Sequence, residues 1–186
     1  MARLRRSIMS TATPSARTLS RGSGTRRSRT VHLPRQIDQL SLAWLLEERP
    51  RHIPVPKRLT GSKAKGAAYE KKVIRELKSR FHPRPVNYHR WVQYHDRNGN
   101  GYCEPEAFIE LASEIILFEC KLTGGHAGRM QVEGLYKPLL EYIFEKPVRC
   151  LLVCKWAGPE TPGPFFNSPE EFINSGEPFG TWHWLP

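Results

Sequence analysis

The stretch from Ile115 to Lys121 constrains the fold more than any other part of the chain. It begins with the apolar, strand-forming run Ile-Ile-Leu-Phe and ends with Glu119-Cys120-Lys121. Side chains alternate between the two faces of a β-strand, so we expect Glu119 and Lys121 to point one way and Cys120 the other. The pattern predicts a buried strand that brings an acid and a lysine to the edge of a sheet.

A second acidic motif, Pro105-Glu106, is separated from Glu119 by twelve residues. Two carboxylates can hold a hard divalent cation through oxygen, and a lysine beside them can steady a water molecule or a developing phosphate charge. Glu104 lies two residues before Glu106, so on a strand it would share the same face and is an alternative first acid. Taken alone, Glu-x-Lys is as compatible with charged residues that only meet solvent.

In order and spacing, these residues resemble the signature of the PD-(D/E)XK nuclease superfamily, with Glu106 in the position usually held by Asp. Members of that superfamily carry a glutamate in a helix before the signature, which Glu70 matches, and often a glutamine in a helix after it, which Gln131 matches. A tyrosine often follows the glutamine by four residues, whereas Tyr136 follows Gln131 by five. The resemblance covers about residues 65–155 and is closest in character to small nucleases of phages and mobile elements.

The resemblance implies an α/β fold with a restriction-endonuclease-like α-β-β-β-α-β core, a mixed sheet flanked by helices, over residues 61–156. It implies hydrolysis of DNA, as an endonuclease, with Mg²⁺ as cofactor and Mn²⁺ as a surrogate. The expected partner is DNA, with no membrane, and the expected assembly is a homodimer or a larger DNA-processing complex.

The resemblance also assigns a role to each matching residue. Glu106, Glu119 and the backbone carbonyl of Cys120 would bind the metal. Lys121 would position or help to deprotonate the attacking water. Glu70 would act as an outer or second-metal carboxylate, and Gln131 would support the site.

The net charge of +11 is unevenly distributed, because the first 30 residues contain eight arginines and no acid. We expect residues 1–34 to form a disordered basic arm, since such a segment buries too little apolar surface to fold. The arm would either tether DNA or act as a mitochondrial transit peptide. The expected compartment is the cytoplasm of a bacterial or phage-infected cell in the first case and the mitochondrial matrix in the second.

Two other functions remain open: a catalytically inactive DNA-binding protein on the nuclease fold, and a basic RNA-binding protein. A helix predicted over residues 62–81 would present basic side chains to phosphates, although a solvated helix face explains them equally well. These residues are Lys65, Lys71, Lys72 and Arg75. The four cysteines have no zinc-site spacing and are expected to be buried, reduced thiols.

The remaining elements follow from periodicity and turn chemistry. Residues 35–60 are expected to form a docking helix, over 35–48, and a proline-rich linker. A hairpin is expected from a strand over 87–95, a turn over 96–101 that contains Asn-Gly twice, and a strand beginning at Tyr102. A second turn near 112–113 leads to the signature strand. A helix over 128–144, split at Gly134 and Pro138, precedes a strand over 148–153. Residues 157–186 are expected to pack on the core, with a helix after Ser168 and an edge strand containing Trp182 and Trp184.

Overall fold

Within the part of the chain that the structure describes, the main sheet contains six strands in the order β2-β5-β6-β7-β9-β8. The structure is a computed structural model and describes residues 35–54 and 58–186, which lie within one unit, 32–186. The strands are β2 (Val86–Tyr88), β5 (Ala107–Glu110), β6 (Ile115–Thr123), β7 (Val148–Trp156), β8 (Phe165–Phe166) and β9 (Phe179–His183). The arm predicted over residues 1–34 lies outside the described residues, as does the linker residue Pro56.

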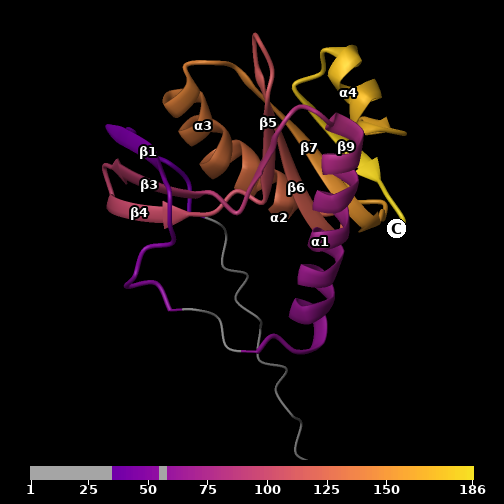
Figure 1. Cartoon of the computed structure of the whole chain (residues 1–186), viewed down its shortest axis with the longest axis horizontal. Helices are drawn as coiled ribbons and strands as arrows, with labels where there is room; N and C mark the ends of the chain where they lie inside the picture. The colour runs from indigo at the N-terminus through magenta and orange to yellow at the C-terminus, as the bar shows by residue number, and fades with distance from the viewer. Residues whose placement is uncertain (1–34, 55–57) are drawn as a thin grey trace, which may run out of the picture. The chain divides into compact units, whose positions relative to one another are not determined.

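Neighbouring strands run antiparallel from β2 through β5 to β6, and parallel from β6 through β7 and β9 to β8. This mixed sheet, with helices on both faces, confirms the predicted α/β class (Figure 1). The signature strand β6 lies in the interior of the sheet, between β5 and β7. Its residues 115–120 are all buried, as the apolar run predicts.

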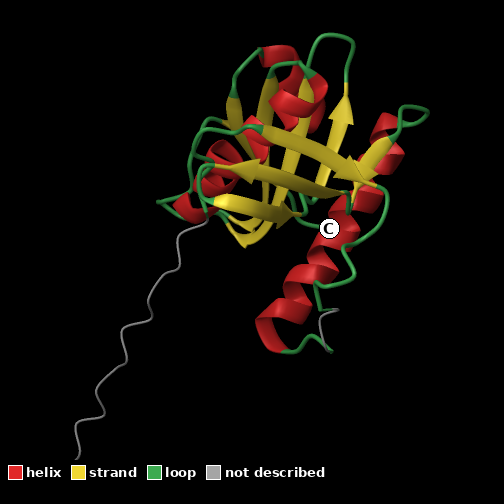
Figure 2. Cartoon of the chain, turned by 90° about the vertical axis from the view of Figure 1, so that its left-hand side faces the viewer, coloured by secondary structure: helices red, strands yellow, loops and turns green. Residues whose placement is uncertain are grey.

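Alternation along β6 divides its side chains between two hydrophobic clusters. Ile116 and Phe118 pack in the cluster that includes α1 (Gly61–Phe81), and Ile115 and Leu117 pack in the cluster that includes α3 (Lys137–Phe144). The helix predicted over 62–81 is therefore confirmed, and it covers one face of the sheet (Figures 1 and 2).

A second sheet, also within the described residues, contains three antiparallel strands in the order β1-β3-β4 (Leu42–Leu46, Trp91–Asp96 and Gly99–Cys103). The turn between β3 and β4 has Gly99 at φ +98°, a conformation that glycine adopts without strain, so the predicted hairpin is confirmed. The strand predicted over 87–95 is wrong as a single element. His89, at φ +52°, separates β2 from β3, and the two strands belong to different sheets.

The docking helix predicted over 35–48 is wrong, because residues 42–46 form strand β1. Gln39 has φ +49°, which interrupts any helix, and β1 pairs with β3 through Ala43↔Tyr94 and Leu45↔Val92. Ala43 is buried while its neighbour Trp44 is exposed, as expected for a strand with one face on the core. Local helical spacing was overridden by pairing with a distant strand.

The helix predicted over 128–144 is present and interrupted, as expected. It consists of α2 (His126–Gln131), the π-helical turn η1 (Val132–Tyr136) and α3. Gly134 lies where the N-terminal segment crosses: its carbonyl accepts from Ile37 N at 2.9 Å, and an added Cβ would overlap the Gln36 amide. The wider turn therefore makes room for a neighbouring backbone.

The C-terminal segment packs Phe172 and Trp182 in the cluster that contains α1, whereas Phe165 is exposed. The Ser168 hydroxyl accepts from Glu171 N at 3.1 Å and caps α4 (Pro169–Ser175), as predicted. Trp182 is 2% exposed on β9, in the cluster that contains α1. The prediction of an edge strand is wrong, because the short strand β8 pairs with the outer side of β9.

All four cysteines lie in the described part of the chain as buried free thiols, which confirms that prediction. Among the described residues, no helix is both long and apolar enough to cross a lipid bilayer.

Candidate active site

The end of β6 brings Glu119 and Lys121 together on one face of the sheet. The Lys121 ammonium donates to Glu119 Oε1 and lies 3.4 Å from Gln131 Oε1 and 3.8 Å from Glu106 Oε1. Glu119 is completely buried, and its second oxygen, Oε2, has no hydrogen-bond partner within residues 35–54 and 58–186. The alternation predicted along this strand therefore holds, and it joins three of the predicted side chains around one lysine.

Glu106 reaches the same point from the start of the neighbouring strand β5. Pro105 and Glu106 precede β5, which pairs with β6 through Ala107↔Phe118, so Glu106 lies beside the segment that follows Phe118. The Glu106 carboxylate accepts a hydrogen bond from the backbone N–H of Cys120. Strand pairing thus places the two acidic motifs side by side, although twelve residues separate them.

Glu104, the alternative first acid, lies in a different environment. Its carboxylate is 3.3 Å from His89 Nδ1, and its side chain is 34% exposed, whereas that of Glu106 is 19% exposed. Lys121 lies close to Glu106, and Cys120 N–H donates to it. The geometry therefore groups Glu106, rather than Glu104, with Glu119 and Lys121.

Burial and mutual repulsion change the acidity of the two central carboxylates. Burial, followed by the charge of Glu119, raises the pKa of Glu106 to about 8. Burial also raises the pKa of Glu119, and contact with the Lys121 ammonium offsets part of that effect. For Lys121, burial lowers the pKa, but Glu119 and Glu106 outweigh it and hold the pKa above its ordinary value.

Gln131 joins the site from the last residue of α2. Its side-chain amide faces Lys121 through Oε1 and donates through Nε2 to the hydroxyl of Tyr136. Residues five apart lie about 140° apart around an α-helix, but a π-helical turn, with its i→i+5 bonds, brings them onto one side. The turn η1 therefore aligns Gln131 with Tyr136 and holds the amide toward the lysine.

Glu70 approaches the site from α1 and has a partner that the sequence did not indicate. His89 Nδ1 lies 3.6 Å from Glu70 Oε1 and also faces Glu104. Burial raises the pKa of Glu70, and the His89 charge acts in the opposite direction. His89 has a left-handed backbone, which is uncommon outside glycine and recurs at functional sites. No local sequence pattern marked this histidine, because its contacts come from α1 and from the segment before β5.

A groove of about 520 Å³, which we call the carboxylate groove, opens beside the site, and its lining includes Glu70, Glu106, Cys120 and Lys121. The small side chains at Gly66 and Ala67, on the first turns of α1, form another part of its wall. Of the basic residues predicted to contact nucleic acid, Lys65, Lys71, Lys72 and Arg75 are all exposed on α1. None of the four lines this groove.

The donor set suits a hard divalent cation, because it offers carboxylate oxygens, one of them buried without a partner among the described residues. Glu106 and Glu119 are the side chains that could hold such an ion. Within the described residues, no group of three or more His, Cys, Asp or Glu side chains is arranged to hold a metal. A site here would therefore need backbone or water oxygens to complete its coordination.

Comparisons of the chain with protein-family models, with curated proteins and with solved structures found no match.

Proposed function

We propose that this protein is a divalent-metal-dependent DNA nuclease of the PD-(D/E)XK type. The observation that carries the proposal is the meeting of Glu106, Glu119 and Lys121 at the ends of two paired strands, with Glu119 Oε2 buried and without a partner in the described part of the chain. A buried acid pair is costly to the fold unless a cation compensates it. An accidental charge pair at a strand end would instead face solvent.

The order of elements supports a restriction-endonuclease-like core. Helix α1 is followed by an antiparallel set, β2, β5 and β6, then by the helical segment α2-η1-α3, and then by β7 parallel to β6. This is an α-β-β-β-α-β sequence, with the β3-β4 hairpin inserted between the first and second strands. The proposed site lies on the part of β6 that extends past its pairing with β5 and still pairs with β7.

In this proposal Glu106 and Glu119, with the backbone carbonyl of Cys120, hold Mg²⁺, and Mn²⁺ can replace it. The bound ion supplies Lewis acidity and a site at which water is acidified. Glu106 has a pKa of about 8 without metal, so it must lose a proton when the ion binds.

Lys121 has a positional role. Its ammonium contacts the carboxylate of Glu119 and lies 3.8 Å from Glu106. In this proposal it turns toward the attacking water or the phosphate oxygen when the ion binds. Gln131, held by Tyr136, restricts where the ammonium can go. Glu70, held by His89, would act as the outer carboxylate that binds a water or a second ion.

The π-helical turn also accounts for the departure from the superfamily spacing. A glutamine and a tyrosine four residues apart share one side of an α-helix, and Gln131 and Tyr136 share one side of a π-turn at five. The inserted residue therefore leaves their contact intact, which supports Gln131 as the counterpart of the superfamily glutamine.

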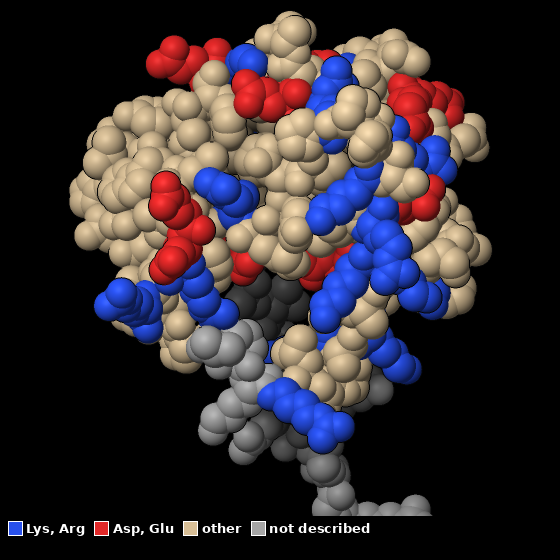
Figure 3. Space-filling model, in the orientation of Figure 1, with Lys and Arg blue, Asp and Glu red and all other residues tan. Residues whose placement is uncertain are grey.

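DNA as the substrate is supported by the basic side chains gathered over α1, next to the groove (Figure 3). The rival function, a DNA-binding protein without catalysis, is favoured by one observation: the described residues contain no cluster of three metal-ligating side chains. The two functions predict the same binding and different cleavage.

The test is cleavage of a DNA panel comprising linear duplex, nicked duplex, single strand, flap and four-way junction, with Mg²⁺, Mn²⁺ or chelator. We expect metal-dependent cutting that falls at least about 100-fold in Glu119→Gln and Lys121→Ala, since both touch the reacting groups. Glu110→Gln and Lys146→Ala are the matched controls and should cut normally. They break an ion pair of 2.7 Å between Glu110, at the end of β5, and Lys146, which precedes β7. Glu106→Gln should also abolish cutting, and Glu104→Gln should spare most of it.

Equal affinity for DNA in all variants, without cleavage in any metal, would overturn the nuclease proposal in favour of the binding protein.

A further inference from the structure

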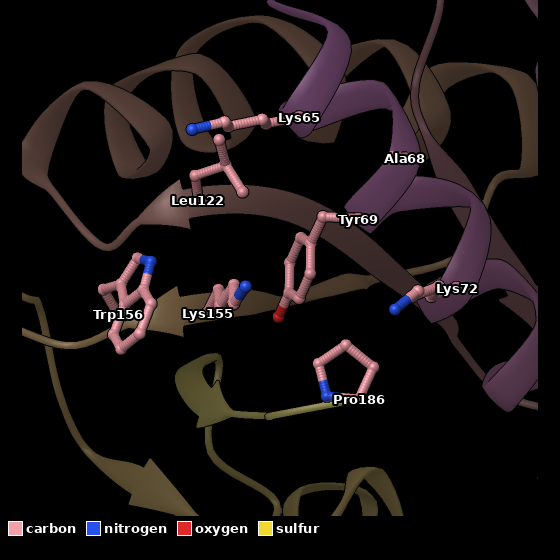
Figure 4. A pocket seen from close by; sticks show the side chains of 8 residues that line it. All are labelled: Lys65, Ala68, Tyr69, Lys72, Leu122, Lys155, Trp156 and Pro186. Atoms are coloured by element: carbon pink, nitrogen blue, oxygen red, sulfur yellow. The ribbon is translucent and has the colours of Figure 1, made fainter. Parts of the chain in front are cut away.

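A second pocket, of about 420 Å³, lies beside the carboxylate groove. We call it the Trp156 pocket, and six residues matter for its chemistry: Lys65, Tyr69 and Lys72 from α1, Leu122 from β6, and Lys155 and Trp156 from β7. Figure 4 shows these side chains around one space, with Tyr69 projecting from α1 between Lys65 and Lys72. Leu122 also lines the carboxylate groove, so the two hollows adjoin.

The Trp156 pocket is lined by three lysines and, at one side, by the C-terminal residue Pro186. Lys65, Lys72 and Lys155 line it, and within residues 35–54 and 58–186 none of the three has a carboxylate at ion-pair distance. Other lysines of that part of the chain do pair with an acid, as Lys121, Lys137 and Lys146 do. Three ammonium groups without a carboxylate partner around one hollow favour an anionic occupant with several charges.

The pocket also presents an aromatic ring to solvent. Trp156 is 56% exposed, more than any other tryptophan among the described residues. The Lys155 ammonium lies 5.2 Å from the centre of its ring. The ammonium therefore lies over one face of the indole, and the exposed part of the ring can stack with a flat, electron-rich group.

Together, these lysines and an exposed indole are the elements with which proteins bind unpaired nucleic acid strands: phosphates on cations and bases on aromatic rings. We infer that the Trp156 pocket binds a single-stranded segment of DNA, with one base stacked on Trp156 and the adjoining phosphates on Lys65, Lys72 and Lys155. A base within a duplex has both faces stacked on its neighbours and cannot lie on the indole, so the pocket selects an unpaired strand.

The inference deepens the proposed function and rests on it in one respect: the strand bound here is the one that continues, past Leu122, into the carboxylate groove. In the other direction a further hollow adjoins, whose lining includes Lys72, Arg75 and Trp184 and also the acid Glu76. The preferred substrate would then be DNA with an unpaired strand next to the cut, such as a flap or a single-stranded end.

Binding is measured in chelator, so that no cleavage is needed, by fluorescence anisotropy of a labelled oligothymidylate of about ten nucleotides. A duplex of the same length is measured in parallel. We expect Trp156→Ala to weaken single-strand binding about tenfold, as loss of one base stack does, and to leave duplex binding unchanged. Trp156→Phe, which keeps an aromatic ring, should retain most of the affinity.

Trp44→Ala is the matched control, because Trp44 is also exposed (37%) but lies on β1 in the second sheet. For the charges, Lys65→Gln/Lys72→Gln should reduce the slope of log affinity against log salt by about 1.4, or about 0.7 for each phosphate that is no longer neutralised. Lys78→Gln/Lys137→Gln removes the same charge outside the pocket and should change the slope less. The arginines of residues 1–30 are common to all variants, so ratios between variants cancel their contribution.

Single-strand binding that is unaffected by Trp156→Ala, or duplex binding that falls by the same factor, would overturn the inference. The nuclease proposal fails by a different result, the absence of metal-dependent cleavage in the wild type. If Trp156→Ala loses single-strand binding and the wild type does not cleave DNA, the binding inference stands and the nuclease proposal fails. If the wild type cleaves DNA and Trp156→Ala binds single strands normally, the nuclease proposal stands and the binding inference fails.

Discussion

Glu119 and Glu106 are residues at which the requirements of folding and of the proposed chemistry conflict. Glu119 is fully buried with one oxygen lacking a partner in the described residues, and Glu106 is held beside it. Burial and the charge of Glu119 raise the pKa of Glu106, and Lys121 compensates only part of that effect. An apolar or amide side chain would cost the fold less, which supports the proposed metal site.

The conflict predicts that Glu106→Gln stabilises the metal-free protein at neutral and alkaline pH. Because the folded-state pKa of Glu106 is raised from 4.5 to about 8, its contribution to stability is complete below about pH 4.5 and is lost as the pH rises to about 8. Glutamine stays neutral and still accepts from Cys120 N–H. In chelator, the variant's advantage should grow by up to about 1.4 kcal/mol per pH unit across that window.

Thermal unfolding as a function of pH, with chelator and with Mg²⁺, measures this effect. Adding Mg²⁺ should stabilise the wild type and leave Glu106→Gln unchanged. Glu104→Gln, at a more exposed carboxylate, is the control and should follow the wild type. Parallel pH curves for wild type and Glu106→Gln would show that the folded-state pKa of Glu106 is not raised.

At the scale of elements, two glycines have opposite effects on stability, one in the β3-β4 hairpin and one in α1. In the β3-β4 hairpin, Gly101 pairs with Tyr94, whose ring is 2% exposed and covers the glycine. An added Cβ at Gly101 would overlap that ring, whereas one at Gly66, on the first turns of α1, would meet no atom within 4 Å. The first glycine is required by packing and the second only lowers helix propensity.

We therefore expect Gly101→Ala and Gly66→Ala to shift stability in opposite directions. Gly101→Ala should lower the free energy of unfolding by about 1–3 kcal/mol, because the buried Tyr94 ring must move. Gly66→Ala should raise it by about 0.5–1 kcal/mol. Denaturant unfolding of the two variants beside the wild type tests both signs, and a neutral Gly101→Ala would mean that the Tyr94 ring packs elsewhere.

At the scale of the whole described unit, Asp96 joins the segment before β1 to the β3-β4 hairpin. The buried carboxylate accepts from the Arg35 guanidinium, from Asp38 N at 3.3 Å and from Asn98 N at 2.9 Å. Burial would raise the pKa of Asp96, but these donors outweigh it, so the pKa lies below its ordinary value of 3.8. Asp96 therefore has a structural role: its carboxylate connects the segment at residues 35–38 to the hairpin.

Asp96→Asn should lower the free energy of unfolding by about 2 kcal/mol near pH 7, since a charged acceptor is replaced by a neutral one. A lowered folded-state pKa contributes stability that is complete above about pH 4 and is lost as the pH falls through the folded value. The difference between wild type and variant should therefore shrink in acid. Chemical unfolding at neutral and acid pH measures it.

The control for this prediction is Asp38→Asn. Its carboxylate is 47% exposed and lies 3.8 Å from Arg97, so a small loss with little pH dependence is expected. An Asp96→Asn difference that persists undiminished in acid would contradict the role of the charged carboxylate.

The sequence by itself determined the elements whose signals are local. The apolar run before Glu119 predicted β6, the stripe ending at Phe81 predicted α1, and Asn-Gly chemistry predicted the hairpin. Ser168 marked the start of α4, and the break in the second long helix was visible at Gly134. Alternation along β6 also predicted that Glu119 and Lys121 share a face, because that geometry depends only on neighbouring residues.

Tertiary structure decided what depends on partners far away in the chain. Residues 42–46 have helical spacing but form a strand, because they pair with β3, about 50 residues further along the chain. Pairing of β5 with β6 placed Glu106, and not Glu104, beside Cys120 N–H, and a π-helical turn brought Tyr136 onto Gln131. His89 and the Trp156 pocket arise where α1 meets segments that no local window of sequence contains, so only packing could bring them together.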